Sequence, residues 1–293
     1  MKCIIPKYSG FCFGVSLAVD AAYENLDGHT YMLGEVVHNP SVVKDLQSKG
    51  LKLVNSIEEI TETDVNVLIR AHGVSEKVIN ELHKRGLGVI DKTCPKVKKV
   101  HDIVVDASRR GLDIIVVGTP NHPEIVGTIG WSSTKTVLVY NLEDAKKIIP
   151  NTDFSRKGVC MVAQTTYNKR IYEEIYTYCS KIIPNIEFHN TICNATANRQ
   201  YEIRELAKKS DAILVIGGKT SSNVTKLYEI ASEYCHNTQH VETAEQIDVD
   251  KLANVDTLVI ASGASTPEDS IQKAIQVVKG YCDLNGISFK MDK

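Results

Sequence analysis

Three cysteines lie in similar surroundings along this 293-residue chain, and this repetition constrains the fold more than any other feature. Each cysteine follows a short strand-like run and precedes an amphipathic helical pattern. An apolar run that ends in glycine comes next, 22, 24 and 24 residues after the cysteine. The cysteines are Cys12, Cys94 and Cys193, and the glycines are Gly34, Gly118 and Gly217.

The repeat continues beyond each glycine with a polar loop, a helix and two further strands. The chain therefore predicts three similar α/β units with mostly parallel sheets and helices outside them. We expect units at 1–93, 94–192 and 193–282, followed by a C-terminal tail at 283–293. The alternative is one doubly wound sheet whose βα units merely look alike. The equivalence of the three segments favours three units, with ligands beyond the carboxyl ends of the strands.

The composition is that of an ordinary soluble globular protein, and we expect it to lie in the cytoplasm. Hydrophobic residues make up 43% of the chain and charged residues 24%, and no apolar run approaches the length needed to cross a bilayer. The net charge of -2 gives no general attraction to nucleic acid or to an anionic membrane, so we expect neither as a partner. The first residues lack the apolar core of a secretory signal. Eight cysteines in such a protein favour metal binding or burial over disulfides.

The three repeated cysteines are candidate metal ligands. A helix N-terminus favours thiolate over thiol, and Pro95 is a natural first residue of the helix after Cys94. Three soft ligands from distant segments suit an iron–sulfur cluster better than a structural zinc, which prefers four ligands. A 4Fe–4S cluster on three cysteines leaves one iron open for chemistry. We expect the other five to be small buried hydrophobes: Cys3, Cys160, Cys179, Cys235 and Cys282.

The loops after the strands carry hydrogen-bonding side chains at corresponding positions. In the first loop of each unit, His38, His122 and Asn223 lie 26, 28 and 30 residues after the cysteine. Neutral or weakly cationic donors beside helix N-termini are suited to a phosphate or diphosphate. Each residue taken singly could equally be a helix cap. The remaining candidates are His72, Thr165, Ser221, Ser222 and Ser265.

Glu124 is the only carboxylate within these loops, two residues after His122. One carboxylate among donors at a cluster site is a candidate proton source. A glutamate in the first turn of a helix is also favoured by the helix dipole alone. The sequence leaves both interpretations open.

Nine segments together resemble the 4-hydroxy-3-methylbut-2-enyl diphosphate reductase family (IspH/LytB). The segments are SGFCFGV, GEVVHNPSVV, IRAHGV, DKTCPKV, GTPNHPE, AQTT, ICNATANRQ, GGKTSSNV and ASGAST. The resemblance extends to about Ser270. It implies a trefoil-like arrangement of the three units around a central cluster held by Cys12, Cys94 and Cys193.

The resemblance also implies reductive dehydroxylation of an allylic diphosphate to isopentenyl and dimethylallyl diphosphate, the last step of the methylerythritol phosphate pathway. It implies ferredoxin or flavodoxin as electron donor. It implies that Glu124, His122 and Thr165 act in catalysis, with Glu124 central to proton delivery. The residues that it implies for substrate binding are His38, His72, His122, Thr165, Ser221, Ser222, Asn223 and Ser265.

Two other functions fit the same residues. A non-redox hydro-lyase would use the open iron to remove water without electrons. An iron–sulfur sensor would bind a diphosphate without turnover. A requirement for an external reductant distinguishes the reductase from the hydro-lyase, and the absence of any product would indicate the sensor.

Overall fold

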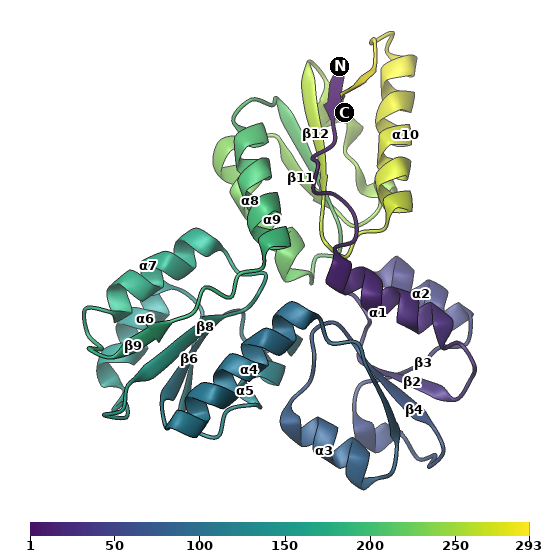
Figure 1. Cartoon of the computed structure of the whole chain (residues 1–293). Coiled ribbons are helices and arrows are strands. Elements are labelled where there is room, and N and C mark those ends of the chain that lie inside the picture. The colour runs from purple at the N-terminus through teal and green to yellow at the C-terminus, as the bar shows by residue number, and fades with distance from the viewer. Residues whose placement is uncertain (293) are drawn as a thin grey trace. The chain divides into compact units, whose positions relative to one another are not determined.

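The computed structural model describes residues 1–292 and contains three β-sheets with helices on their faces (Figure 1). Every strand pairing in the three sheets is parallel. The predicted α/β class with mostly parallel sheets is therefore confirmed.

The elements follow the repeat along the chain. The first set is α1 (Phe13–Glu24), β2 (Thr30–Leu33), α2 (Pro40–Ser48), β3 (Lys52–Val54), β4 (Asn66–Ile69), α3 (Glu76–Lys84) and β5 (Gly88–Asp91). The second is α4 (Pro95–Arg110), β6 (Asp113–Val117), α5 (Pro123–Ile129), β7 (Thr136–Val139), α6 (Leu142–Ile148), β8 (Val159–Ala163), α7 (Lys169–Cys179) and β9 (Ile186–Phe188). The third is α8 (Asn194–Ala207), β10 (Ala212–Ile216), α9 (Ser222–Tyr234), β11 (Thr238–Val241), β12 (Thr257–Ser262) and α10 (Glu268–Leu284).

The three sheets share one strand order. The first is β3-β2-β4-β5 and the second is β7-β6-β8-β9. The third is β11-β10-β12-β1-β13, where β1 is Lys2–Ile4 and β13 is Lys290–Asp292. The fourth strand of every sheet is the strand that precedes a repeated cysteine. For the third sheet that strand is the N-terminal one, so Lys2–Ile4 pairs with residues some 255 positions later rather than with the unit that follows it.

The chain divides into two compact units. The terminal unit comprises Met1–Val15, His38–Val42 and the chain from Asn194 onward, and it contains the third sheet. The central unit comprises Ser16–Val37 and Val43–Cys193, and it contains the first and second sheets. The strand β13 adds part of the expected tail at 283–293 to the sheet of the terminal unit.

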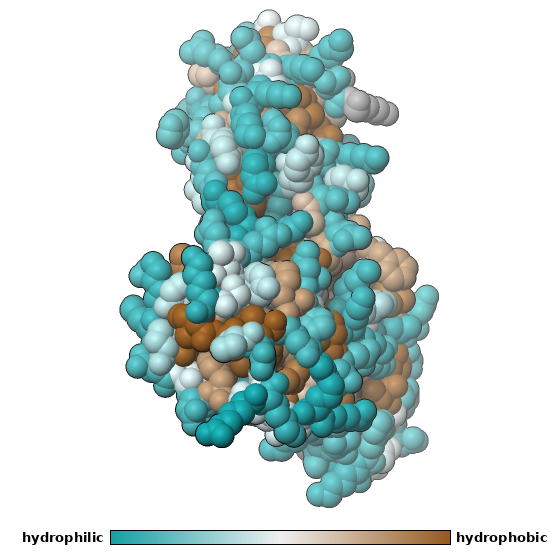
Figure 2. Space-filling model, turned by 60° about the vertical axis from the view of Figure 1, so that its left-hand side comes forward, coloured by the Kyte–Doolittle hydropathy of each residue, from teal (hydrophilic) through white to brown (hydrophobic). Residues whose placement is uncertain are grey.

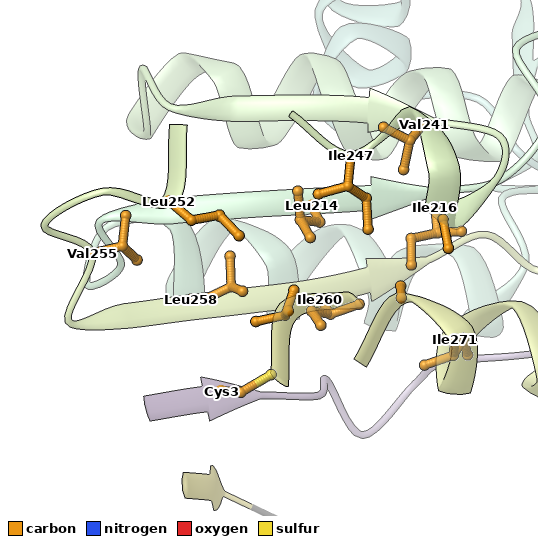
Figure 3. Packing of buried hydrophobic residues seen from close by; sticks show 14 of the residues in the cluster. Cys3, Leu214, Ile216, Val241, Ile247, Leu252, Val255, Leu258, Ile260 and Ile271 are labelled. Carbon is orange, nitrogen blue, oxygen red and sulfur yellow. The ribbon is translucent and has the colours of Figure 1, made fainter. Parts of the chain in front are cut away.

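The core of the terminal unit shows why its strands are apolar throughout. Leu214, Ile216 and Ile260 face α10, where they pack with Ile271 (Figure 3). The neighbouring residues on the same strands point to the other face and pack against α8 and α9. Successive strand residues point to opposite faces, so a sheet covered on both sides needs apolar residues at both sets of positions. Figure 1 shows these helices on the two faces of the sheet.

The central unit is built in the same way. Leu33, Val67 and Ile69 of the first sheet pack with Leu82 of α3. In the second sheet, Ile114 and Val116 pack against α4 and α5, and β8 contributes to the same core. On the face in Figure 2, hydrophilic residues surround scattered hydrophobic patches. Over residues 1–292, no helix combines the length and apolar character that crossing a membrane requires.

Candidate active site

Each repeated cysteine stands immediately before a helix, as the sequence predicts. Cys12 precedes α1, Cys94 is the N-cap of α4 with Pro95 as its first residue, and Cys193 precedes α8. The three helices have 12, 16 and 14 residues, so each is long enough for its helix dipole to place partial positive charge next to the cysteine at its N-terminus. In general a helix N-terminus favours the thiolate, which is the form of cysteine that binds metal.

One backbone hydrogen bond recurs at all three cysteines. The amide of Cys94 donates to the carbonyl of Ala71 at 3.0 Å, and the amide of Cys193 donates to the carbonyl of Thr165 at 3.0 Å. The amide of Cys12 donates to the carbonyl of Ala264 at 3.1 Å. Each acceptor lies two residues beyond the third strand of a repeat. The bond therefore fixes every cysteine beside a loop that carries a predicted substrate-binding residue.

The cysteines fall into two classes of burial. Cys12, Cys94 and Cys193 are partly exposed, and none of the eight cysteines is in a disulfide. The other five are buried, as expected for hydrophobic packing. Burial raises the pKa of Cys3 and of Cys160 to about 12, so these thiols stay protonated and are poor metal ligands. Accessible thiols at helix N-termini fit an iron–sulfur cluster, and the buried ones do not.

Glu124 and Thr165 are joined by two hydrogen bonds in the central unit. The Thr165 amide donates to Oε1 of Glu124 at 2.6 Å, and the Thr165 hydroxyl donates to Oε2 at 2.9 Å. Glu124 is only 2% exposed. Burial raises its pKa from 4.5 to about 7, although the two bonds from Thr165 act in the opposite direction. A carboxyl with this pKa can hold and release a proton near neutral pH.

Two predicted histidines contact each other, and one of them is bonded to Glu124. The rings of His72 and His122 meet edge to face with their centres 5.3 Å apart. His122 is the N-cap of α5, and its Nδ1 accepts from the amide of Glu124 at 3.1 Å. Nδ1 is therefore used as a cap. The capping alternative therefore holds for this nitrogen.

The serines of the terminal unit gather at the start of α9. Ser221 is the N-cap residue, but its side chain makes no capping bond. Instead, the hydroxyl of Ser265 donates to the hydroxyl of Ser221 at 3.5 Å, which links the two predicted loops. Ser222 and Asn223 form the first turn of α9 and are buried.

Asn223 is the clearest sign of a ligand in the terminal unit. Its side chain is 3% exposed. Neither the amide nitrogen nor the amide oxygen has a hydrogen-bond partner among residues 1–292. A buried amide without partners costs free energy, and such an arrangement is typical of a side chain that pairs with a ligand.

His38 is held in the terminal unit by a close approach of backbones. A Cβ at Gly218 would lie 2.2 Å from the carbonyl oxygen of His38, so only glycine fits there. The next residue, Asn39, caps α2 through its side-chain oxygen, which accepts from the amides of Ser41 and Val42. Asn39 is thus an ordinary cap, whereas His38 is half-buried before the helix.

Two residues that support Cys12 escaped the sequence analysis. Arg199 is buried on α8 and donates from Nη2 to the carbonyl of Gly10 at 2.8 Å. Glu202, one turn further along α8, accepts from the amides of Lys7 and Tyr8 at 2.7 and 3.1 Å. They fix the loop that leads to Cys12. Arg199 lies within the segment ICNATANRQ that carries the family resemblance, but the segment does not show its partner, because the contacts of Arg199 and Glu202 join segments about 190 residues apart.

Comparison with known proteins agrees with this arrangement. The LytB protein family matches residues 3–279. A 4-hydroxy-3-methylbut-2-enyl diphosphate reductase of Caldanaerobacter subterraneus subsp. tengcongensis is 41% identical over 285 residues, which cover 95% of this chain and 97% of that protein. The protein of the same description from Aquifex aeolicus is 38% identical over 286 residues, with 96% of each chain covered.

Two solved structures share the fold. The E-1-hydroxy-2-methyl-but-2-enyl-4-diphosphate reductase of Plasmodium falciparum has a TM-score of 0.90 at 29% identity, and the match covers 100% of this chain and 92% of that one. An (E)-4-hydroxy-3-methyl-but-2-enyl diphosphate reductase, described as the terminal enzyme of the non-mevalonate pathway, has a TM-score of 0.68 at 37% identity. The match to this second structure covers 95% of this chain and 99% of the other chain. On these matches, and with the threefold repeat of cysteine, strand and loop along nearly its whole length, the chain belongs to the LytB protein family.

Proposed function

We propose that this protein is a 4-hydroxy-3-methylbut-2-enyl diphosphate reductase that carries out the terminal step of the non-mevalonate route to isoprenoids. The identity to relatives of that activity over nearly the full length of both chains supports it. The observation in the structure that carries the proposal is the buried Glu124–Thr165 pair. A carboxyl that titrates near pH 7 beside a hydroxyl is what protonation of a leaving hydroxyl group needs.

The reaction breaks the allylic C–O bond and forms a C–H bond at one of two carbons. It consumes two electrons and two protons, and the oxygen leaves as water. The products are isopentenyl diphosphate and dimethylallyl diphosphate. The chain must therefore bind a diphosphate, deliver protons at one place and accept electrons from outside.

Cys12, Cys94 and Cys193 are the proposed ligands of a 4Fe–4S cluster. Their partial exposure and their places before three helices support this assignment over any of the five buried cysteines. When bound, such a cluster supplies electrons one at a time and offers one iron without a protein ligand as a Lewis acid.

The diphosphate is the proposed partner of the polar loops. Asn223 supports this assignment most directly, because its amide is buried without a partner among the described residues. Donors around it at the start of α9 suit an anion without a cluster of lysines. The proposed binding residues of the terminal unit are His38, Ser221, Ser222, Asn223 and Ser265, and those of the central unit are His72, His122 and Thr165.

Glu124 is the proposed proton donor, with Thr165 orienting its carboxyl group. In the protonated state Glu124 can give a proton to the departing hydroxyl group. The Thr165 hydroxyl then hydrogen-bonds the carboxylate that remains. His122 holds the first turn of α5, and therefore Glu124, through its bond to the Glu124 amide.

The proposed electron donor is a ferredoxin or a flavodoxin, and the proposed compartment is the cytoplasm. The lack of a disulfide among residues 1–292 suits a reducing compartment.

An anaerobic assay tests the function. The purified protein with its cluster is given 4-hydroxy-3-methylbut-2-enyl diphosphate and electrochemically reduced methyl viologen. Dye oxidation that depends on substrate, with both five-carbon diphosphates as products, is the expected result. A protein that holds its cluster but neither oxidises the dye nor forms these products would overturn the proposal; product formed without dye oxidation would identify a hydro-lyase.

A further inference from the structure

One of the three repeated cysteines differs from the others in the charge around it. Within eight residues on either side, Cys94 has four lysines, whereas Cys12 has one and Cys193 has none. The four are Lys92, Lys96, Lys98 and Lys99. The fold and the cysteine position are the same in all three repeats. Neither helix formation nor binding of a metal by the cysteine therefore explains the lysines around Cys94.

These lysines face water. Lys96, Lys98 and Lys99 are exposed on the first two turns of α4, and Lys92 is half-buried just before Cys94. The opposite face of the helix carries Val97 and Val100, which are buried. The lysine side chains therefore extend away from the second sheet and are accessible to another molecule.

Most of this charge is not neutralised within the chain. Lys98 forms an ion pair with Asp91 at 2.6 Å. No carboxylate in the described part of the chain lies within 4 Å of the ammonium groups of Lys92, Lys96 or Lys99. From Asp91 to Asp102 the segment has four lysines against two aspartates, in a chain whose net charge is -2. The surface beside Cys94 is thus positive in an otherwise slightly acidic protein.

We propose that Lys92, Lys96 and Lys99 form the docking surface of an acidic one-electron carrier protein, which reduces the enzyme beside Cys94. The inference rests on the proposed reductase function, because only a reductase needs such a partner. The carrier gives up one electron in each encounter and leaves oxidised, so two encounters supply one turnover.

Physical chemistry favours this partner over a small anion. Single lysines on an exposed helix bind a small anion weakly, but together they attract a protein of opposite charge and orient it. Complexes between redox proteins are small and short-lived, so unpaired lysines in place of a large apolar patch are what such an interface requires. Its position next to a proposed cluster ligand gives the electron a short path.

The experiment compares two double variants with the same change in charge. Lys96→Glu/Lys99→Glu reverses the proposed surface. Lys147→Glu/Lys181→Glu is the matched control, since both residues are exposed in the central unit; Lys147 lies in the last turn of α6 and Lys181 just beyond α7. None of the four residues belongs to the proposed substrate or cluster sites. Iron content and visible absorbance establish that each variant holds its cluster.

Turnover is measured with a reduced acidic ferredoxin and, separately, with reduced methyl viologen. We expect kcat/KM for the ferredoxin to fall at least about tenfold in Lys96→Glu/Lys99→Glu, and its dependence on salt to weaken. Viologen is a small cation, so turnover with this dye should stay within about twofold of the unaltered enzyme. The control should stay within about twofold with both donors.

Equal losses in both double variants, or no loss in either, would overturn the docking surface. Failure of the unaltered enzyme with viologen would instead refute the proposed function. Binding of oxidised ferredoxin at low ionic strength provides a readout without turnover. Equal affinity of the unaltered protein and Lys96→Glu/Lys99→Glu there would also overturn the surface.

Discussion

Thr165 binds both carboxylate oxygens of Glu124, one through its amide at 2.6 Å and the other through its hydroxyl at 2.9 Å. The two residues lie 41 positions apart. Glu124 is in the first turn of α5, which follows β6, and Thr165 is in the loop after β8, the strand next to β6 in the sheet. Their contact fixes a buried carboxyl whose pKa is raised to about 7 by burial. Several consequences of this contact can be measured.

Glu124→Gln should keep the cluster and the substrate affinity but lose most turnover. Glutamine has the same shape and can still pair with Thr165, but it cannot donate a proton in the way an acid does. General acid catalysis contributes on the order of 10² to 10⁴ in rate, so kcat should fall by that factor. Viologen-linked turnover and iron content measure the two properties. Near-normal turnover would remove Glu124 from the mechanism.

The pH dependence of turnover should report the same group. Glu124 acts as an acid only while protonated, and burial raises its pKa to about 7. The value of kcat should therefore be high below pH 7 and decline as pH rises through about 7. The residual rate of Glu124→Gln should lack this decline. The same alkaline limb in both proteins would mean that another group controls it.

Because the pKa of Glu124 is raised in the folded state, the stability of the folded protein should fall as pH rises. Burial raises the pKa of Glu124 from 4.5 to about 7, so the folded state holds the proton more tightly than the unfolded state does. The folded protein loses stability as pH rises from 4.5 to 7, by about 3 kcal/mol at 1.36 kcal/mol for each pKa unit. Glu124→Gln should not show this loss of stability, because glutamine does not titrate.

Thermal unfolding followed anaerobically at pH 5.5 and pH 8 measures the part of this loss that falls between pH 5.5 and 7, about 2 kcal/mol at 1.36 kcal/mol for each pKa unit. The midpoint of Glu124→Gln relative to the unaltered protein should be higher at pH 8 than at pH 5.5. A constant difference between the two pH values would contradict burial as the cause of the raised pKa.

Cysteine substitutions should separate ligands from core residues. Changing Cys12, Cys94 or Cys193 to serine should each remove the intact cluster, because a hydroxyl is a poor ligand for iron. Cys160→Ser should retain the cluster and lose a small amount of stability, since that thiol lies within the second sheet. Iron and sulfide content per chain measure the outcome. Full cluster content in any of the three ligand variants would exclude that cysteine.

Asn223→Ala should raise the stability of the folded protein and weaken its binding of the substrate. The substitution removes a buried amide that has no partner among residues 1–292, so the free energy of unfolding should rise by about 1 kcal/mol. It also removes a proposed donor to the diphosphate, so KM should rise about tenfold or more. Asn223→Asp should raise KM further, because the carboxylate repels the diphosphate. Unchanged KM in both variants would place the diphosphate elsewhere.

Trp131 should matter for the position of His72. Its indole Nε1 donates to the carbonyl of Val74 at 2.9 Å, and its ring stacks on His101 at 5.3 Å. Trp131→Phe keeps a ring but loses this bond, at a cost of about 1 kcal/mol. We expect KM to rise several-fold while kcat and cluster content change little. A loss confined to kcat would argue against a positioning role.

The sequence by itself determined the repeating elements and the positions of the chemical groups. The apolar runs predict strands buried on both faces, as in parallel sheets, and the amphipathic segments after each cysteine predict helices. Both predictions are possible because these patterns are local in the sequence. The equivalence of the three cysteines was visible for the same reason. Their separation from the other five then followed from spacing, and the burial of those five agrees with it.

Only the tertiary structure decided how distant segments combine. The pairing of Lys2–Ile4 with the third sheet joins the two ends of the chain, and no local pattern encodes a partner some 255 residues away. The capping use of His122 Nδ1, the lack of partners at Asn223 and the support of Gly10 by Arg199 likewise depend on neighbours in space. The pKa of Glu124 is the clearest case. The sequence left it as either a proton donor or a dipole-stabilised glutamate, and burial against Thr165 set its proton affinity.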